Sequence, residues 1–109
     1  MNLNKLLPLS ETTYYILLSL LTPSHGYAIM QTVESLSEGK VKVAAGTLYG
    51  AIENLLKQDV IVPVGSYDSR RKVYALTPTG RELLHMEYQR MAHLIRVSDQ
   101  QLHPGEERV

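Results

Sequence analysis

The chain of 109 residues contains no cysteine, no tryptophan and no phenylalanine. The absence of cysteine excludes disulfides and thiolate-bound metals. No apolar stretch has the roughly 20 residues that a membrane-spanning helix needs, and Tyr14–Leu21 is far too short. The first residues lack the apolar core and the small-residue cleavage site of a secretion signal. We therefore expect a soluble cytoplasmic protein with no membrane contact.

The polar residues show no catalytic or metal-binding pattern. His25, His85, His93 and His103 have no ligand-like spacing with carboxylates. No set of nucleophile, base and orienting group is visible either. The sequence therefore predicts neither an enzyme nor a metal site, and it implies no cofactor.

The chain also lacks an excess of charge of either sign, because 11 basic and 11 acidic side chains cancel. A neutral total is by itself an argument against nucleic-acid binding. The distribution is uneven, however: residues 40–81 hold seven basic and three acidic side chains, whereas residues 1–39 and 82–109 are each net negative by two charges. Such asymmetry matters more for DNA binding than the total. A random scatter of surface charge is the alternative.

Two helices are predicted in the first third of the chain. Ser10 can cap a helix over residues 10–21, and a second helix is expected over residues 24–36. The alternation in Lys40–Val43 predicts a very short strand. The apolar residues expected in the core are Ile16, Leu17, Leu20 and Leu21 of the first helix and Ala28, Ile29, Val33 and Leu36 of the second.

A third helix is predicted over residues 45–58 and is followed by a hairpin. Val60–Tyr67 and Arg71–Leu76 are strand-like, with a turn between them. Pro63 cannot donate to a strand ladder, so its strand is expected at an edge or to be irregular. The fold class that follows is mainly α with a small β-hairpin, the layout of a winged helix-turn-helix.

The last helix is predicted to begin with Thr77 as its cap and Pro78 at its first position. Its seam has the 4-3-4-3-4 spacing of a coiled coil and comprises Leu84, Tyr88, Met91, Ile95, Ser98 and Leu102. Since a small domain already has its own core, we expect this seam, together with Leu3 and Leu6, to form a homodimer interface. Packing within one monomer is the alternative. Residues 1–77 would then form the DNA-binding domain, and residues 78–109 a dimerisation helix with a polar tail.

The predicted third helix has one apolar face and one face of small and polar residues. The small residues of this face are Ala45, Gly46 and Gly50. They let a helix approach base edges in the major groove. Thr47 can contact a phosphate or a thymine methyl, Asn54 can pair with adenine, and Tyr49 can reach a phosphate. Alternatively, Tyr49 packs against the second helix and Asn54 is merely solvated.

The hairpin carries a basic run that can lie along the phosphate backbone or enter the minor groove. The residues expected to contact DNA here are Ser69, Arg70, Arg71 and Lys72, with Lys42 ahead of the third helix. Because side chains alternate along a strand, Arg70 and Lys72 are expected on one face. Tyr74 joins either that face or the core. A solvated charge run is the alternative.

Several pieces in this order resemble the PadR family of bacterial transcriptional regulators. They are Leu18–Leu21 with His25-Gly26-Tyr27, then Gly46-Thr47-Leu48-Tyr49, then Arg70–Gly80. Each piece alone is weak, but the ordered set, from about Leu9 to Leu102, is specific. The single helix after the hairpin resembles the compact branch of the family more than the branch with a longer C-terminal domain.

The resemblance implies a winged helix-turn-helix homodimer whose third helix enters the major groove of a palindromic operator in double-stranded DNA. It also implies a repressor that releases DNA when a small molecule or another signal arrives. Some compact relatives bind flat, apolar drugs at the dimer interface with a tryptophan, which this chain lacks. Tyr14, Tyr15 and Met91 can still line a pocket for a small apolar or aromatic effector; dimer-core packing is the alternative.

These observations together predict a sequence-specific DNA-binding regulator. The principal rival is a winged-helix module that binds a protein partner without specific DNA binding, which the neutral net charge permits.

Overall fold

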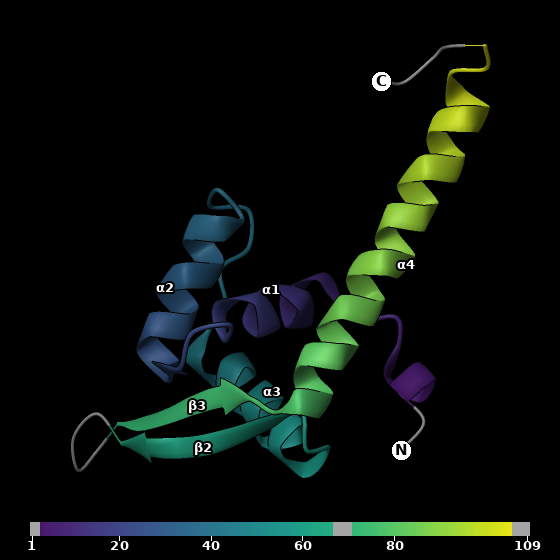
Figure 1. The fold of residues 1–109 in the computed structure, drawn as a ribbon. Coiled ribbons are helices and arrows are strands. Elements are labelled where there is room, and N and C mark those ends of the chain that lie inside the picture. Colours follow the sequence, from purple (N-terminus) through teal and green to yellow (C-terminus); the bar gives the residue numbers. More distant parts are fainter. Residues whose placement is uncertain (1–2, 67–70, 106–109) are drawn as a thin grey trace.

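The computed structural model describes residues 3–66 and 71–105 and is mostly helical, with a small three-stranded antiparallel sheet (Figure 1). The elements in chain order are a 3-10 helix η1 (Leu3–Leu6), α1 (Glu11–Ser19), β1 (Ser24–His25), α2 (Gly26–Leu36), α3 (Ala45–Lys57), β2 (Ile61–Ser66), β3 (Lys72–Leu76) and α4 (Pro78–Leu102). The mainly α fold class with a hairpin wing is confirmed.

Side-chain caps set the first residues of three helices. The Ser10 hydroxyl accepts a hydrogen bond from the Thr13 N–H at 3.1 Å, and the Thr77 hydroxyl accepts one from the Gly80 N–H at 2.9 Å. Both caps were predicted. His25 caps α2, because its Nδ1 accepts from the Ala28 N–H at 3.4 Å. Each cap satisfies a backbone donor that the first helical turn leaves unpaired.

The sheet has the order β1-β3-β2, so the return strand of the hairpin is its centre. Pro63 lies in the edge strand β2, where the pairing with β3 shifts register between Pro63 and Gly65. An edge position with an irregularity was expected, because proline has no N–H to donate.

Two local predictions were wrong. Ser24 and His25 form a strand rather than the first turn of a helix, because they pair with Tyr74 and Val73 of β3. Lys40–Val43 is not a strand. The Ser37 side chain instead pairs with the backbone of Val41, accepting from its N–H at 2.9 Å and donating to its carbonyl at 3.2 Å.

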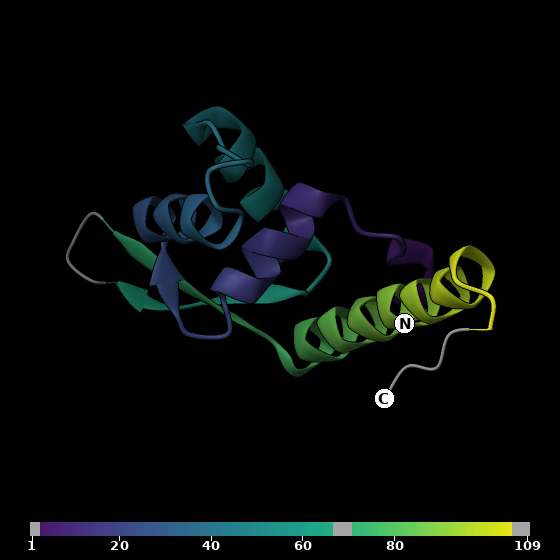
Figure 2. The ribbon, with the colours of Figure 1, turned by 90° about the horizontal axis from the view of Figure 1, so that it is seen from above.

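The core lies between α1, α2 and the first part of α4. Buried residues of α3 and of the sheet complete it. Figure 2 shows α1 between α3 and α4. Leu21 and Leu36 were expected in this core, yet they are 47% and 48% exposed. Leu21 follows the end of α1 and Leu36 is the last residue of α2, so both side chains lie beyond the packed helix faces.

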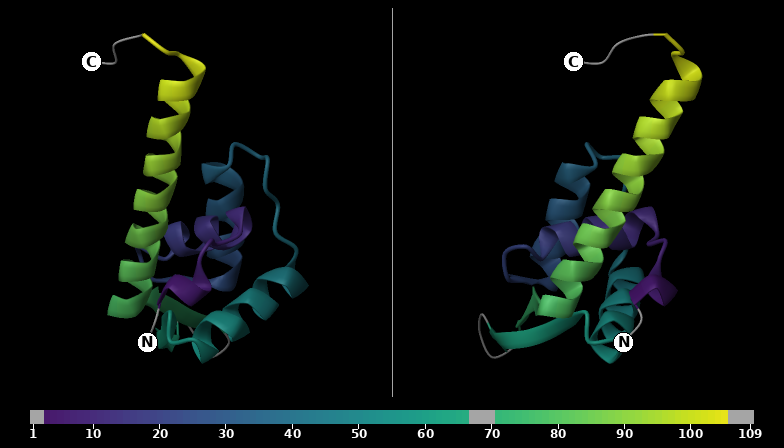
Figure 3. Two further views of the ribbon diagram at one scale, coloured as in Figure 1. Left: turned by 90° about the vertical axis from the view of Figure 1, so that its right-hand side faces the viewer. Right: turned by 45° about the vertical axis from the view of Figure 1, so that its right-hand side comes forward.

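Helix α4 packs on the domain only through its N-terminal part. Its buried residues are Gly80, Leu83, Leu84 and Glu87. Beyond these the helix extends away from the rest of the protein (Figures 1 and 3). Within residues 3–66 and 71–105, no helix is long and apolar enough to cross a membrane.

Candidate nucleic-acid interface

One face of α3 is buried and the opposite face is open to solvent. Leu48, Ile52 and Leu55 hold the helix against the core. The residues predicted to contact DNA are all exposed, namely Ala45, Gly46, Thr47, Tyr49, Gly50 and Asn54. The small and polar face inferred from the sequence is therefore an accessible surface.

The N-terminal end of α3 is uncapped. Its cap residue Ala44 makes no side-chain hydrogen bond, so the first backbone N–H groups are available to an outside acceptor. A Cβ built on Gly46 or Gly50 meets nothing within 4 Å. Packing inside the chain therefore does not require glycine at either position, and a partner's backbone can come close to the helix there.

Thr47, Gly50 and Asn54 lie on one side of α3, and Tyr49 lies on another. The tyrosine is 51% exposed, and its hydroxyl would be 2.5 Å from a Cβ placed on Gly26 at the start of α2. Tyr49 thus contacts the second helix and the solvent together. Asn54 borders a shallow pocket shared with the N-terminal segment, including Lys5.

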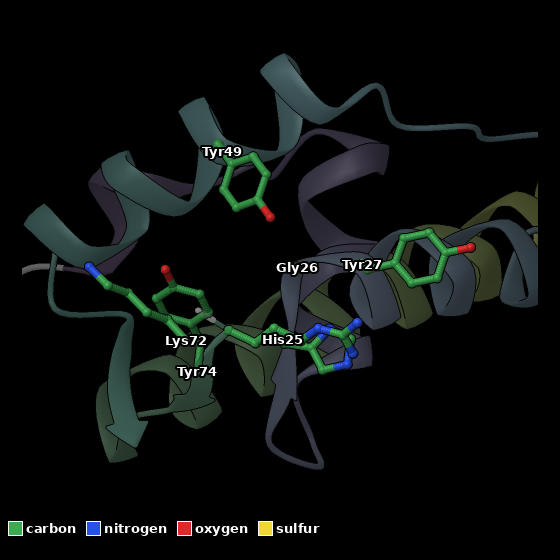
Figure 4. A pocket seen from close by; sticks show the side chains of 7 residues that line it. His25, Gly26, Tyr27, Tyr49, Lys72 and Tyr74 are labelled. Carbon is green, nitrogen blue, oxygen red and sulfur yellow. The ribbon is translucent and has the colours of Figure 1, made fainter. Parts of the chain in front are cut away.

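A pocket of about 430 Å³ lies between the start of α2, the outer side of α3 and the wing (Figure 4). Its lining residues are His25, Gly26, Tyr27, Tyr49, Arg71, Lys72 and Tyr74. The sequence did not decide whether Tyr74 lies on the DNA-facing side of the wing or in the core. It is 7% exposed and belongs to the core, while its hydroxyl points into this pocket.

Arg71 and Lys72 are exposed where the return strand begins. Ser69 and Arg70, also predicted to contact DNA, lie outside the described residues. Lys42 is exposed and forms an ion pair with Glu34 at 3.7 Å. Both side chains of that pair are solvated, so the pair contributes little stability and leaves Lys42 accessible to a phosphate.

The seam of α4 is divided between the monomer's own core and solvent. Tyr88, Ile95 and Leu102 are 57%, 64% and 73% exposed. Leu84 and Leu3, by contrast, are 7% and 8% exposed and belong to the core of their own chain. Their placement at the dimer interface stays a prediction, although little of either side chain is left for a partner. Leu6 is half-buried against the same core.

The three residues predicted for an effector pocket lie together. Tyr14, Tyr15 and Met91 line a cavity of about 440 Å³ with Leu9, Glu11 and Glu87. α1 supplies the tyrosines and α4 supplies Met91 and Glu87. The sequence prediction thus grouped these three residues as the structure does, but it omitted the buried carboxylate beside them.

Glu87 is 1% exposed, and its charge is compensated. One carboxylate oxygen accepts from the Leu9 N–H at 2.6 Å, and the other accepts from the Arg90 guanidinium. The bond from Arg90 holds the pKa of Glu87 below its ordinary value even though burial opposes this. Burial, with Glu87 and Tyr88 nearby, raises the pKa of Tyr14. The i, i+3 spacing of Glu87 and Arg90 was the available sequence signal.

Among residues 3–66 and 71–105, no group of three histidine or carboxylate side chains could hold a metal ion. The accessible groups among the predicted contact residues are backbone donors, hydroxyls, an amide and basic side chains. These groups bind phosphate and base edges, so the fold and this surface together define a winged-helix DNA-binding protein.

The sequence profile of the Transcriptional regulator PadR-like family matches residues 10–86, and the chain belongs to that family. The members of this family are DNA-binding transcriptional regulators and not enzymes.

The chain is also similar to individual proteins. An uncharacterized 37.1 kDa protein in transposon TN4556 of Streptomyces fradiae is 39% identical over 72 residues, which cover 66% of this chain and 20% of that protein. A PadR-like transcription factor from "bacteroid fragilis" is 26% identical, with a TM-score of 0.67 over 80% of this chain and 85% of that one. RosR from H. salinarum is 19% identical and shares the fold, with a TM-score of 0.68 over 94% and 84%.

Proposed function

We propose that this protein is a homodimeric, sequence-specific repressor that inserts α3 into the major groove of its operator. The exposed face of α3 carries the proposal, because it combines an uncapped helix start, two glycines in open space and the polar side chains of Thr47 and Asn54. Arg71 and Lys72 line a pocket with Tyr49 of α3, and in this proposal they contact the neighbouring phosphates.

The part of α4 beyond Glu87 supports a dimer. Tyr88, Ile95 and Leu102 are exposed along one face of this part, and Leu94 is exposed on a neighbouring face. Solvent contact with these apolar side chains is unfavourable, and a twofold partner would remove much of it. A twofold dimer also presents two copies of α3 about one DNA turn apart, which matches a palindromic operator. In this proposal residues 1–77 bind DNA and residues 78–109 hold the dimer together.

Release by a small molecule is part of the same proposal. The cavity of Tyr14, Tyr15 and Met91 is mainly apolar and lies between α1 and the dimer helix α4. A small apolar or aromatic effector would pack against the two rings and the flexible methionine. Such a ligand would change how α4 is held against the DNA-binding domain.

A gel shift with the DNA upstream of its own gene, at two salt concentrations and with random DNA as competitor, tests the regulator function. Thr47→Ala should weaken operator binding by about 1–3 kcal/mol while the dimer remains intact. Equal binding by variant and wild type would remove Thr47 from the interface. Binding no tighter than to random DNA would favour the rival function, a winged-helix module for a protein partner.

A further inference from the structure

Two tyrosines approach the pocket between α2, α3 and the wing from opposite sides. Tyr49 comes from α3, with its hydroxyl directed toward Gly26, and Tyr74 comes from β3, with its hydroxyl directed toward α3 (Figure 4). Tyr74 is 7% exposed, and its hydroxyl has no hydrogen-bond partner within the part of the chain that the structure describes. Among the described residues no buried side-chain oxygen or nitrogen lacks a partner, so this hydroxyl is accessible from the pocket and can donate to an acceptor that enters it.

The backbone around the pocket is held rigidly. Ser24 and His25 pair with Tyr74 and Val73, which ties the start of α2 to the wing strand. A Cβ at Gly26 would lie 2.5 Å from the Tyr49 hydroxyl and 2.9 Å from its Cζ. Any larger side chain there would displace the tyrosine ring, so glycine keeps the Tyr49 hydroxyl in its place beside α2.

The pocket has the charge of an anion site. Arg71 and Lys72 line it, none of the described lining residues is a carboxylate, and the positive end of the α2 dipole faces it. The remaining polar groups include the hydroxyls of Tyr49 and Tyr74, which donate hydrogen bonds without carrying charge. A phosphate oxygen accepts from both kinds of group.

We propose that this pocket binds one phosphodiester of the DNA strand that borders the groove entered by α3. The inference rests on the proposed DNA binding and adds Tyr74 to the contacts, a residue assigned to the core by its burial. The pocket opens beside the exposed face of α3 and is larger than a single phosphate group, which leaves room for the attached sugars. The tyrosines position the strand, and Arg71 and Lys72 supply the charge.

Substitutions that remove only an oxygen test the proposal. Tyr49→Phe and Tyr74→Phe keep the ring packing, and Ser35→Ala, which removes an exposed hydroxyl of α2 outside the pocket, is the control. Each protein is titrated with a short random-sequence duplex over KCl from about 50 to 200 mM, because non-specific affinity measures phosphate contacts. Thermal unfolding of each variant verifies that the fold is retained.

Each tyrosine variant in the pocket should bind about tenfold more weakly at every salt concentration, with an unchanged slope of log affinity against log salt, because a hydroxyl releases no counterion. Lys72→Ala should instead reduce that slope by about 1. The loss of binding free energy in the double variant should be smaller than the sum of the losses in the two single variants, because both hydroxyls bind the same phosphate group. The Ser35→Ala control should match wild type.

Wild-type protein that fails to bind DNA would overturn the proposed function together with this inference. Wild-type binding that both phenylalanine variants reproduce would overturn the inference alone. Saturable binding of inorganic phosphate, with DNA affinity unaffected by either variant, would assign the pocket to a free anion instead of the DNA backbone.

Discussion

Gly50 and Gly80 both lie in helices, yet a methyl group would meet very different surroundings at the two positions. A Cβ on Gly50 contacts nothing within 4 Å, whereas one on Gly80 would lie 2.0 Å from the carbonyl oxygen of Val60. Thr77 donates to the Asp59 carbonyl at 2.6 Å beside this contact. Gly80 thus lets the first turn of α4 pack directly against the backbone of Val60, just before β2. Gly50 has no such packing role within the chain.

We expect Gly80→Ala to lower the free energy of unfolding by about 1–3 kcal/mol, because backbone must move to relieve the contact. Gly50→Ala, its matched control, should raise it by up to about 1 kcal/mol through helix propensity. The same Gly50→Ala variant should bind operator more weakly, because its methyl group faces the DNA. Urea unfolding and gel shifts measure these effects. Unchanged DNA binding by Gly50→Ala would remove close backbone approach from the proposal.

Glu87 should make stability depend on pH. Its pKa in the folded state lies below the ordinary value of 4.5, first because of the bond from Arg90. Its stabilising contribution is therefore present above that value and is lost as the pH falls through the folded-state pKa. Glu87→Gln should be less stable than wild type near neutral pH, and the difference should shrink on acidification. Urea unfolding at about pH 7 and about pH 3 measures this. A difference that is independent of pH would contradict the ion pair.

At the scale of single elements, α4 has two functions along its length. Up to Glu87 it belongs to the core of the domain, and beyond Glu87 its apolar residues face solvent. The even spacing of the seam predicted one continuous contact. The structure instead divides it, because α1 covers only the N-terminal part of the helix.

We expect Ile95→Glu to weaken the dimer by about 100-fold or more, because association would bury an unpaired charge. The monomer should keep its fold, since Ile95 is 64% exposed. Gln100→Glu adds the same charge to another exposed face of α4 and should leave the dimer intact. Sedimentation equilibrium measures both, with circular dichroism for the fold. A wild-type-like dimer in the Ile95→Glu variant would place the interface elsewhere.

At the scale of the whole molecule, the N-terminal segment connects α3, the proposed DNA-binding helix, to α4, the proposed dimer helix. Lys5, Leu6 and Leu9 line a pocket with residues of α3 and with Leu83 of α4. The Leu9 N–H also donates to Glu87 beside the candidate effector cavity. A ligand in that cavity could therefore shift α3 through the N-terminal segment. In the proposed dimer, such a shift would change the distance between the two copies of α3.

The proposed dimer predicts a fixed distance between operator half-sites. Inserting about five base pairs at the operator centre turns one half-site to the opposite side of the DNA, because a helical turn takes about 10 base pairs. Binding should fall to the affinity of a single half-site in a gel shift. Substitutions at the centre that keep the length serve as the control. Full affinity after the insertion would show that the two units are not rigidly joined.

Local signals in the sequence determined most of the helices, the hairpin and the exposed face of α3. Ser10, Thr77 and Pro78 act within one helical turn, and the apolar spacing of α3 identifies its buried side without knowledge of what covers it. Such features depend on neighbours a few residues away, so the order of residues is enough to predict them.

Contacts between distant segments decided the rest. Strand β1 exists because β3 pairs with it. Leu3 and Leu84 are buried because they join one core cluster with residues from distant parts of the chain. The pocket that contains Tyr49 and Tyr74 requires α2, α3 and the wing to meet, and the two tyrosines are 25 positions apart in the chain. Whether a given side chain is covered depends on how whole helices and strands pack together. The spacing of residues within one element does not specify that packing.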